Sequence, residues 1–216
     1  MVVSTSKVLS VNVGGVRAID VGERTITTAI WKSPVEGRVA VSGVNVSGDD
    51  QADRSVHGGH DKAVYAYAWE DTLWWQEQLG RELEPGNFGE NLTLAGVDVR
   101  DAIVGEVWRV GSALLEVSEP RFPCFKLGLR MGDPKFLKRF AAARRTGTYL
   151  RIAEAGDVGA GDPVERVAQP DHGVTIGLFA EAYLGDHALA VRLLEAPQMS
   201  EEWRHWARGR GDHVAG

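Results

Sequence analysis

The sequence predicts a mainly β protein with helices (α+β), in which a β-barrel or sandwich is followed by a small helical unit. Between residues 7 and 165, short apolar runs are separated by turn residues about every 8–12 positions, as in barrels and sandwiches. The chain contains 26 glycines, many beside polar residues, which indicates many tight turns. After residues 169–171 the spacing becomes helical. We therefore expect one domain over residues 1–168 and a second over 169–216.

The expected strands are short and end at glycine or polar residues. They lie at residues 8–13, 39–41, 63–67, 91–94, 105–111, 113–117, 148–152 and 161–167. Gly111 and Ser112 separate two of these segments, so residues 105–117 are expected to form a hairpin with this dipeptide as its turn.

Two helices are expected to interrupt the strands. Residues 69–79 place apolar side chains at helical spacing, and Gly80 can end that helix. A second helix is expected from Asp133 to about residue 144. In it, Asp133 would be the N-cap and Pro134 the first helical residue.

The C-terminal segment is expected to form three short helices, at residues 175–184, 186–194 and 200–208, with Asp186 and Ser200 as caps. Three helices in about 45 residues bury little apolar surface by themselves. We therefore expect them to pack on the β-rich part or to meet a partner.

The composition argues against several functions. A net charge of -6 argues against a broad surface for nucleic acid or for an acidic membrane. The first residues carry no signal-peptide apolar region, no apolar run is long enough to cross a membrane, and there is one cysteine. We therefore expect a cytoplasmic protein. The sequence has no Gly-x-Ser-x-Gly elbow, Walker loop or Gly-x-Gly-x-x-Gly motif, which argues against the common hydrolase and nucleotide sites.

The only cysteine, Cys124, ends the proline-rich run 118–124. One thiol cannot form an internal disulfide or a four-cysteine metal site. A functional Cys124 would therefore be a thiolate nucleophile, or one ligand of a metal held mainly by another group. Arg121 would favour the thiolate by its opposite charge. Cys124 also fits a small buried hydrophobe beside two prolines.

The densest polar segment is the glycine-rich stretch 48–63. Gly58 and Gly59 allow backbone N–H groups to form an anion-binding concavity. Arg54, His57 and Lys62 add donors that suit a phosphate or a polar ring. The alternative is a solvated loop whose aspartates bond to their own turns.

The same stretch also contains metal-ligand residue types. His57, His60 and Asp61 would suit a metal hydrolase that keeps one position open for water. Their spacing falls in a predicted loop rather than on a helix face.

Two further clusters carry polar groups. Glu90 and Asn91 precede a predicted strand, so the amide can contact the edge of a heterocycle or cap backbone groups. Arg144, Arg145 and Arg151 can bind an anion, or they can form the cationic end of the second helix.

Taken in order, these motifs resemble the MOSC family, a domain first described at the C-terminus of molybdenum-cofactor sulfurases. The resemblance is closest to its stand-alone bacterial YiiM-like branch and covers about residues 7–167. The tail is similar to the three-helix domain that follows MOSC in this branch. The residues that carry the resemblance are Thr28, Ala29, Ile30 and Lys32, with segments 48–53, 57–63, 88–92, 120–124 and 146–151.

The resemblance implies a MOSC-type β-barrel and a molybdenum cofactor (molybdopterin). Cys124 would be the protein's thiolate ligand to molybdenum, because soft sulfur ligands suit that metal site. Arg121 would pair with anionic groups of the cofactor, and His57 would place the cofactor or deliver a proton. The other residues implied to bind the cofactor are Arg54, Gly58, Gly59, Asp61, Lys62 and Asn91.

The enzymatic members of this branch resemble reductases of N-hydroxylated compounds, which implies a two-electron N–OH reduction. Nothing in the sequence can take electrons from NAD(P)H, so a separate reductase is expected as a partner, with the C-terminal helices as its docking surface. Three other functions stay open. They are a sulfur carrier or cofactor-handling protein with a Cys124 persulfide, a non-catalytic ligand-binding module, and the metal hydrolase. The metal content of the purified protein separates them.

Overall fold

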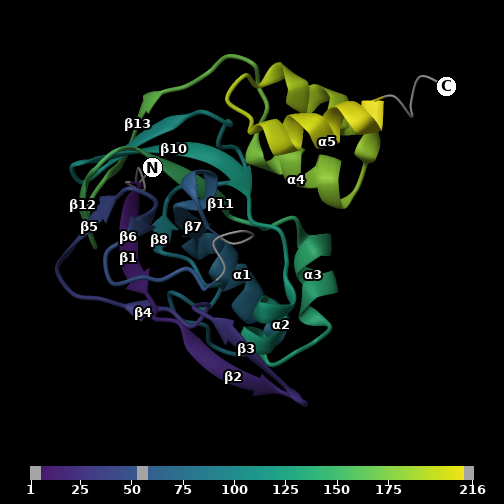
Figure 1. Ribbon diagram of the computed structural model, residues 1–216. Coiled ribbons are helices and arrows are strands. Elements are labelled where there is room, and N and C mark those ends of the chain that lie inside the picture. Colours follow the sequence, from purple (N-terminus) through teal and green to yellow (C-terminus); the bar gives the residue numbers. More distant parts are fainter. Residues whose placement is uncertain (1–5, 53–57, 212–216) are drawn as a thin grey trace.

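The protein is built around one large sheet, seen in a computed structural model that describes residues 6–52 and 58–211 (Figure 1). Most neighbouring strands are antiparallel, but β7 and β8 run parallel. In spatial order, the strands are β13 (Val164–Ala168), β9 (Val107–Val110), β10 (Ala113–Pro120), β11 (Thr148–Glu154), β7 (Val64–Ala68), β8 (Leu92–Ala95), β1 (Lys7–Val13) and β4 (Ser33–Pro34). The predicted mainly β fold with helices is confirmed.

The sheet curls so that its distant strands meet, although no continuous ladder closes it among the described residues. Lys7 in β1 bridges to Pro163, the residue before β13. The Val8 N–H donates to the Asp162 carbonyl at 2.9 Å, and the Val164 N–H donates to the Ser6 carbonyl at 2.9 Å. The expected barrel is therefore a strongly curved sheet whose two sides touch at one point.

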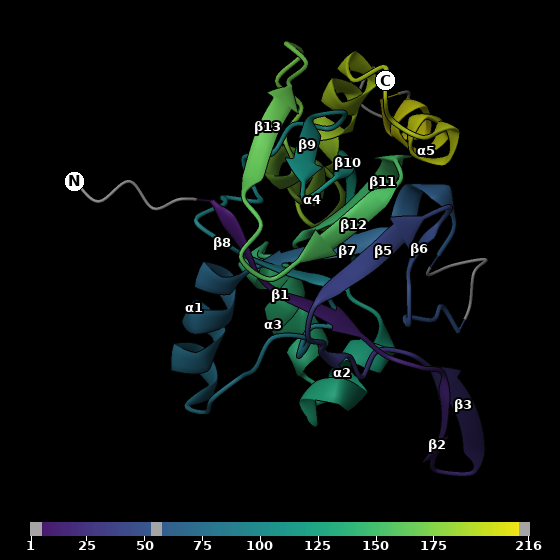
Figure 2. The same ribbon diagram turned by 90° about the vertical axis from the view of Figure 1, so that its left-hand side faces the viewer.

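Two small sheets complete the β structure. β5 (Arg38–Ser42) pairs with β6 (Asn45–Val46) and β12 (Gly156–Gly159). β2 (Arg17–Val21) and β3 (Arg24–Thr28) form a hairpin that projects from the body of the protein (Figure 2). Every predicted strand is present, and the predicted Gly111–Ser112 turn is confirmed because Val110 pairs with Ala113. The β2–β3 hairpin was not predicted, although β-branched residues on both sides of a glycine signal it.

Strand β7 separates two apolar clusters because its side chains alternate between the faces of the sheet. Val64 and Ala66 join the main core, whereas Tyr65 and Tyr67 join an aromatic cluster with α1 (Trp69–Leu79), α2 (Phe125–Met131) and α3 (Phe136–Ala143). Both faces of β7 are thus covered. This explains why its five residues are all buried rather than alternately exposed.

The helices partly follow the sequence predictions. α1 has the predicted bounds, and Gly80 ends it in the left-handed conformation. α3 begins two residues later than predicted, at Phe136. Its N-cap is Lys135, whose N–H donates to the Asp133 side chain at 2.8 Å. The predicted Asp133 N-cap is therefore wrong by two positions. α2 was not predicted at all.

The C-terminal segment packs beside β10, which α4 contacts (Figure 1). It consists of α4 (Ile176–Leu184), the 3₁₀ helix η2 (His187–Glu195) and α5 (Glu201–Gly211). The predicted middle helix is therefore 3₁₀ in form, and Asp186 caps it as expected by accepting from the Ala188 N–H at 3.0 Å. Residues of this segment and of the sheet share one apolar cluster. A separate domain over 169–216 stays a prediction.

Within residues 6–52 and 58–211, no helix combines the length and the apolar character needed to cross a membrane.

Candidate functional site

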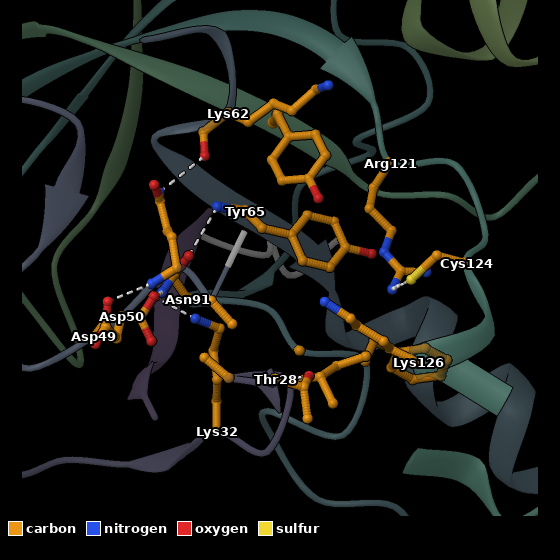
Figure 3. A pocket seen from close by; sticks show the side chains of 17 residues that line it. Thr28, Lys32, Asp49, Asp50, Lys62, Tyr65, Asn91, Arg121, Cys124 and Lys126 are labelled. Carbon is orange, nitrogen blue, oxygen red and sulfur yellow. Dashed lines mark hydrogen bonds and ion pairs between the residues drawn. The ribbon is translucent and has the colours of Figure 1, made fainter. Parts of the chain in front are cut away.

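An open cleft lies beside Cys124 and contains about 600 Å³ of space, including the solvent at its mouth (Figure 3). Its walls come from segments far apart in the sequence. They include Thr28 at the end of β3, the loop residues Asp49 and Asp50, Lys62 of the 3₁₀ helix η1 (His60–Lys62), Tyr65 of β7, Asn91 before β8, Arg121 after β10, and Lys126 of α2.

Cys124 lies half-buried directly before α2. The Nη2 of Arg121 donates to its Sγ at 3.8 Å, so the two residues that the sequence paired are neighbours in the pocket. Arg121 is only 5% exposed, and its guanidinium lies 5.8 Å from the Tyr65 ring centre and 5.6 Å from that of Phe140. Its buried Nη1 has no hydrogen-bond partner within the described ranges. Since a buried donor without an acceptor is costly, this atom indicates a site for an anionic group.

Burial is the largest influence on the pKa values of the groups around Arg121. It raises the pKa of Tyr149 to about 12, although the guanidinium acts in the opposite direction. Burial lowers the pKa of Arg121, but the Cys124 thiol and nearby tyrosines outweigh it, so the pKa is raised overall. Arg121 therefore keeps its charge at neutral pH, and the Tyr149 hydroxyl keeps its proton.

Lys126 is a second cation in this half of the pocket, and the sequence did not single it out. Figure 3 shows its side chain directed into the cleft from α2. α2 was not predicted from the sequence, so it could not be predicted that Lys126 would point into the cleft. No ion pair or hydrogen bond of its amino group occurs among the residues that the structure describes.

The opposite wall holds a buried ion pair. Lys32 is 8% exposed and binds the carboxylate of Asp49. Burial lowers the pKa of Lys32, and Asp49 opposes this effect. Asp49 also accepts hydrogen bonds from the Gly14 N–H at 2.9 Å and from the Asn91 Nδ2 at 2.8 Å. The carboxylate is thus held from three sides.

Asn91, which the sequence singled out, lines the pocket and is almost fully buried. Its Oδ1 accepts from the Tyr65 N–H at 3.1 Å, and its Nδ2 donates to Asp49 and, at 3.3 Å, to the Asn12 carbonyl. The Asn91 amide therefore orients the Asp49 carboxylate and holds β7 against the loop that precedes β8. A contact between Asn91 and a bound pterin stays a prediction.

Glu90 supports the loop that supplies Phe88 and Gly89 to the pocket. Its fully buried carboxylate accepts from the Gly86 N–H at 2.6 Å, the Phe88 N–H at 3.0 Å and the Thr93 hydroxyl at 2.8 Å. Burial raises the pKa of Glu90, while these donors lower it. Gly89 has φ +80°, and a Cβ there would lie 2.8 Å from the Ile30 side chain, so the position favours glycine.

The polar stretch 48–63 is only partly at the site. Lys62 lines the pocket, and its Nζ lies 3.4 Å from Glu119. Within the described ranges, Gly58, Gly59 and Asp61 are not among the lining residues. Asp61 instead accepts from the Arg151 Nε at 2.6 Å. The predicted residues Arg54 and His57 lie outside the described residues.

The predicted arginine cluster does not line the pocket. Arg144, Arg145 and Arg151 pair with carboxylates of Glu181, Asp71 and Asp61 respectively, so they hold elements together instead of lining the pocket. No group of three metal-ligating side chains occurs over 6–52 and 58–211. The metal set of His57, His60 and Asp61 stays untested, since it includes a residue outside those ranges.

The pocket thus offers one thiol, a guanidinium nitrogen that has no partner among the described residues, and further ammonium groups beside aromatic walls. This donor set fits a negatively charged ligand that presents a soft metal to the thiol. Molybdopterin meets these requirements, because its phosphate is anionic and its own sulfurs supply the remaining metal ligands.

Comparison with known proteins identifies the family of this chain. The sequence profile of the MOSC domain matches residues 53–165. YflK of Bacillus subtilis (strain 168) is 35% identical over 200 residues, which cover 91% of this chain and 90% of YflK. The crystal structure of YiiM from Geobacillus stearothermophilus matches with a TM-score of 0.78 and 30% identity, over 95% of this chain and 98% of that chain.

A third relative carries a functional name. A protein named "Reductase" from Gibberella moniliformis is 36% identical over 149 residues, which cover 67% of this chain and 26% of the fungal protein. The resemblance that the motifs suggested is confirmed over nearly the whole length of YflK and YiiM, and the chain belongs to the MOSC domain family.

Proposed function

We propose that this protein is a molybdenum-cofactor-dependent reductase of N-hydroxylated compounds, such as N-hydroxylated purine bases, amidoximes and hydroxylamines. MOSC domains are associated with the molybdenum cofactor in general, and a relative named "Reductase" supports redox chemistry. The observation that carries the proposal is the contact of the only thiol with a buried guanidinium whose Nη1 has no partner within the described ranges.

In this proposal, Cys124 is the thiolate ligand of molybdenum and Arg121 binds an anionic part of the cofactor. Lys126 and Lys62 line the same pocket and add positive charge to it. When bound, the cofactor supplies the two electrons that, with two protons, convert N–OH to N–H and water.

The chain's own contribution is positioning and electrostatics. Tyr65, Phe88 and Tyr149 form aromatic walls that suit a planar ring system. Because the pKa of Tyr149 is about 12, its hydroxyl can donate a hydrogen bond throughout the neutral range. The predicted proton delivery by His57 remains part of the proposal.

A separate electron-donating reductase completes the proposal. The C-terminal helices are its proposed docking surface. Their inner side is occupied, because Trp203 packs against Phe122 with ring centres 5.2 Å apart, so docking would use their outer faces. Reduction driven by a chemical reductant bypasses this partner and tests the active site alone.

The decisive experiment is molybdenum and pterin analysis of the wild type and Cys124→Ser, both purified from a host that makes the cofactor. We expect near-stoichiometric molybdenum and pterin in the wild type, loss of molybdenum in the variant, and amidoxime reduction by the wild type only. Absence of molybdenum from both proteins would contradict the proposal. Labile sulfur on Cys124 would then indicate a sulfur carrier, and zinc that is lost in His60→Ala would indicate a hydrolase.

A further inference from the structure

We propose that the C-terminal helices position the pocket cation Lys62, and that Glu119 is the positioning residue that links Trp203 of α5 to it. The inference rests on the proposed function only in treating Lys62 as a group that faces a bound anion. It gives the C-terminal helices a role inside the site, in addition to any contact with a partner.

The link consists of two contacts to one carboxylate. The Trp203 Nε1–H donates to Glu119 Oε2 at 2.9 Å, and the Lys62 Nζ lies 3.4 Å from Glu119 Oε1. The Glu119 side chain is 5% exposed and that of Lys62 is 22% exposed. Each carboxylate oxygen therefore has its own partner, one in the tail and one at the pocket, where Figure 3 shows Lys62.

An irregularity in β10 places Glu119 between these partners. The register of β10 and β11 shifts between Val117 and Glu119, and residues 117–120 are all buried. A bulge of this kind re-aims side chains and ends the regular alternation. The Glu119 carboxylate can thus meet the tail, although it lies only two residues before Arg121 in the pocket.

Trp203 is well fixed at the other end of the link. Its ring centre lies 5.2 Å from that of Phe122, 5.1 Å from that of Phe179 and 5.1 Å from that of Tyr183. Aromatic contacts at these distances favour a single ring orientation. The indole N–H is therefore held toward Glu119 by packing.

A second set of contacts connects η1, the 3₁₀ helix that contains Lys62, to the C-terminal segment. The Arg151 Nε donates to Asp61 at 2.6 Å, while its Nη2 donates to the Gln198 carbonyl at 2.9 Å. Asp61 immediately precedes Lys62 in η1, so both residues are held by strand residues that also bind the C-terminal segment. This observation is independent of the Glu119 contact.

The pKa of Glu119 depends on both of its partners, Lys62 and Trp203. Burial raises the pKa of Glu119, Lys62 and the Trp203 N–H lower it, and Asp61 raises it. Loss of the indole N–H would leave the buried carboxylate with one charge-stabilising partner fewer. The carboxylate would then be protonated at higher pH, and its hold on Lys62 would weaken.

The test measures the acetylation of Lys62 by acetic anhydride at neutral pH, by peptide mass spectrometry, relative to exposed Lys138 of the same molecule. The variants are Trp203→Phe, which keeps an aromatic ring but removes the N–H, and Glu119→Gln, which removes the charge. Trp206→Phe is the matched control, because Trp206 lies on the same helix and packs on Tyr183 at 5.3 Å. No hydrogen bond of its indole occurs in the described part of the chain.

We expect the Lys62 to Lys138 ratio to rise about two- to fivefold in Trp203→Phe and Glu119→Gln, the range for a partly exposed ion pair, and to stay constant in Trp206→Phe. An unchanged ratio in Trp203→Phe, or an equal rise in Trp206→Phe, would overturn the inference. If Trp203→Phe does not fold, an unchanged ratio in Glu119→Gln overturns it. Because the labelling needs no molybdenum, its outcome is independent of the proposed reductase activity.

Discussion

Arg121→Met should separate binding from folding. Methionine has a similar length but carries no charge and no N–H. Arg121 is 5% exposed, and its Nη1 lacks a hydrogen-bond partner in the described ranges. If Arg121 serves to bind an anion, its replacement should remove the free-energy cost of the buried, unpaired Nη1. It should also abolish retention of the cofactor.

The size of the effect follows from two opposing contributions. A buried, unsatisfied polar group costs about 1–3 kcal/mol. Loss of the cation–π contacts with Tyr65 and Phe140, at 5.8 and 5.6 Å, costs about 0.5–1 kcal/mol each. The variant should therefore lie between about 1 kcal/mol less stable and about 2 kcal/mol more stable than the wild type, which corresponds to a Tm shift between about −4 and +8 °C in a chain of this size.

The assay is thermal unfolding of protein made in a host without pterin synthesis, combined with pterin analysis of protein from a competent host. Phe140→Ala is the reference for a purely structural loss, because it truncates a fully buried ring of the same cluster and should cost about 3–5 kcal/mol. If Arg121→Met is destabilised as strongly as Phe140→Ala, or if it still retains pterin, Arg121 is a structural cation and our reasoning fails.

Two further predictions concern the pocket walls. Glu90→Gln turns an amide NH₂ toward one of the N–H donors of Gly86 and Phe88, so it should lower the free energy of unfolding by about 1–3 kcal/mol in urea titrations. An unchanged midpoint would show that the loop does not depend on this carboxylate. For Tyr149 the pKa is about 12 in the folded protein against a usual 10.0, so its contribution is complete below pH 10 and is lost as the pH rises toward 12. Tyr149→Phe should therefore lose less stability than the wild type between pH 9.5 and pH 11.5, and equal losses would contradict the assigned pKa.

Local sequence patterns were sufficient to predict much of the fold. The strands show alternation and end at glycine, α1 carries its apolar residues at helical spacing, and the Gly111–Ser112 turn joins two such strands. α2 was missed because it is short, follows two prolines and contains Gly128, so its sequence has little intrinsic helix preference. Its stability comes from packing of Leu127 and Met131 into the aromatic cluster.

The site likewise combines features that the local sequence predicts with features that only the folded chain reveals. The motif around Cys124 and Arg121 is contiguous, and the sequence alone paired the two residues. Asp61 was expected at the cofactor, but its partner Arg151 lies 90 positions away, and only the folded chain shows that this ion pair holds η1 in place. Lys126 was missed together with its helix.

By itself, the sequence determined the strand pattern, the family, and the thiol with its neighbouring guanidinium, because strands and motifs are runs of consecutive residues and the family follows from the order of such motifs. Only the tertiary structure decided which charges face the pocket and which are neutralised within the protein. Lys32 is paired with Asp49. Arg144, Arg145 and Arg151 are paired with carboxylates, and Arg121 Nη1 is left unsatisfied within the described ranges. The physical reason is that solvation and pairing of a charge depend on whatever the fold brings within a few ångströms, regardless of distance along the chain.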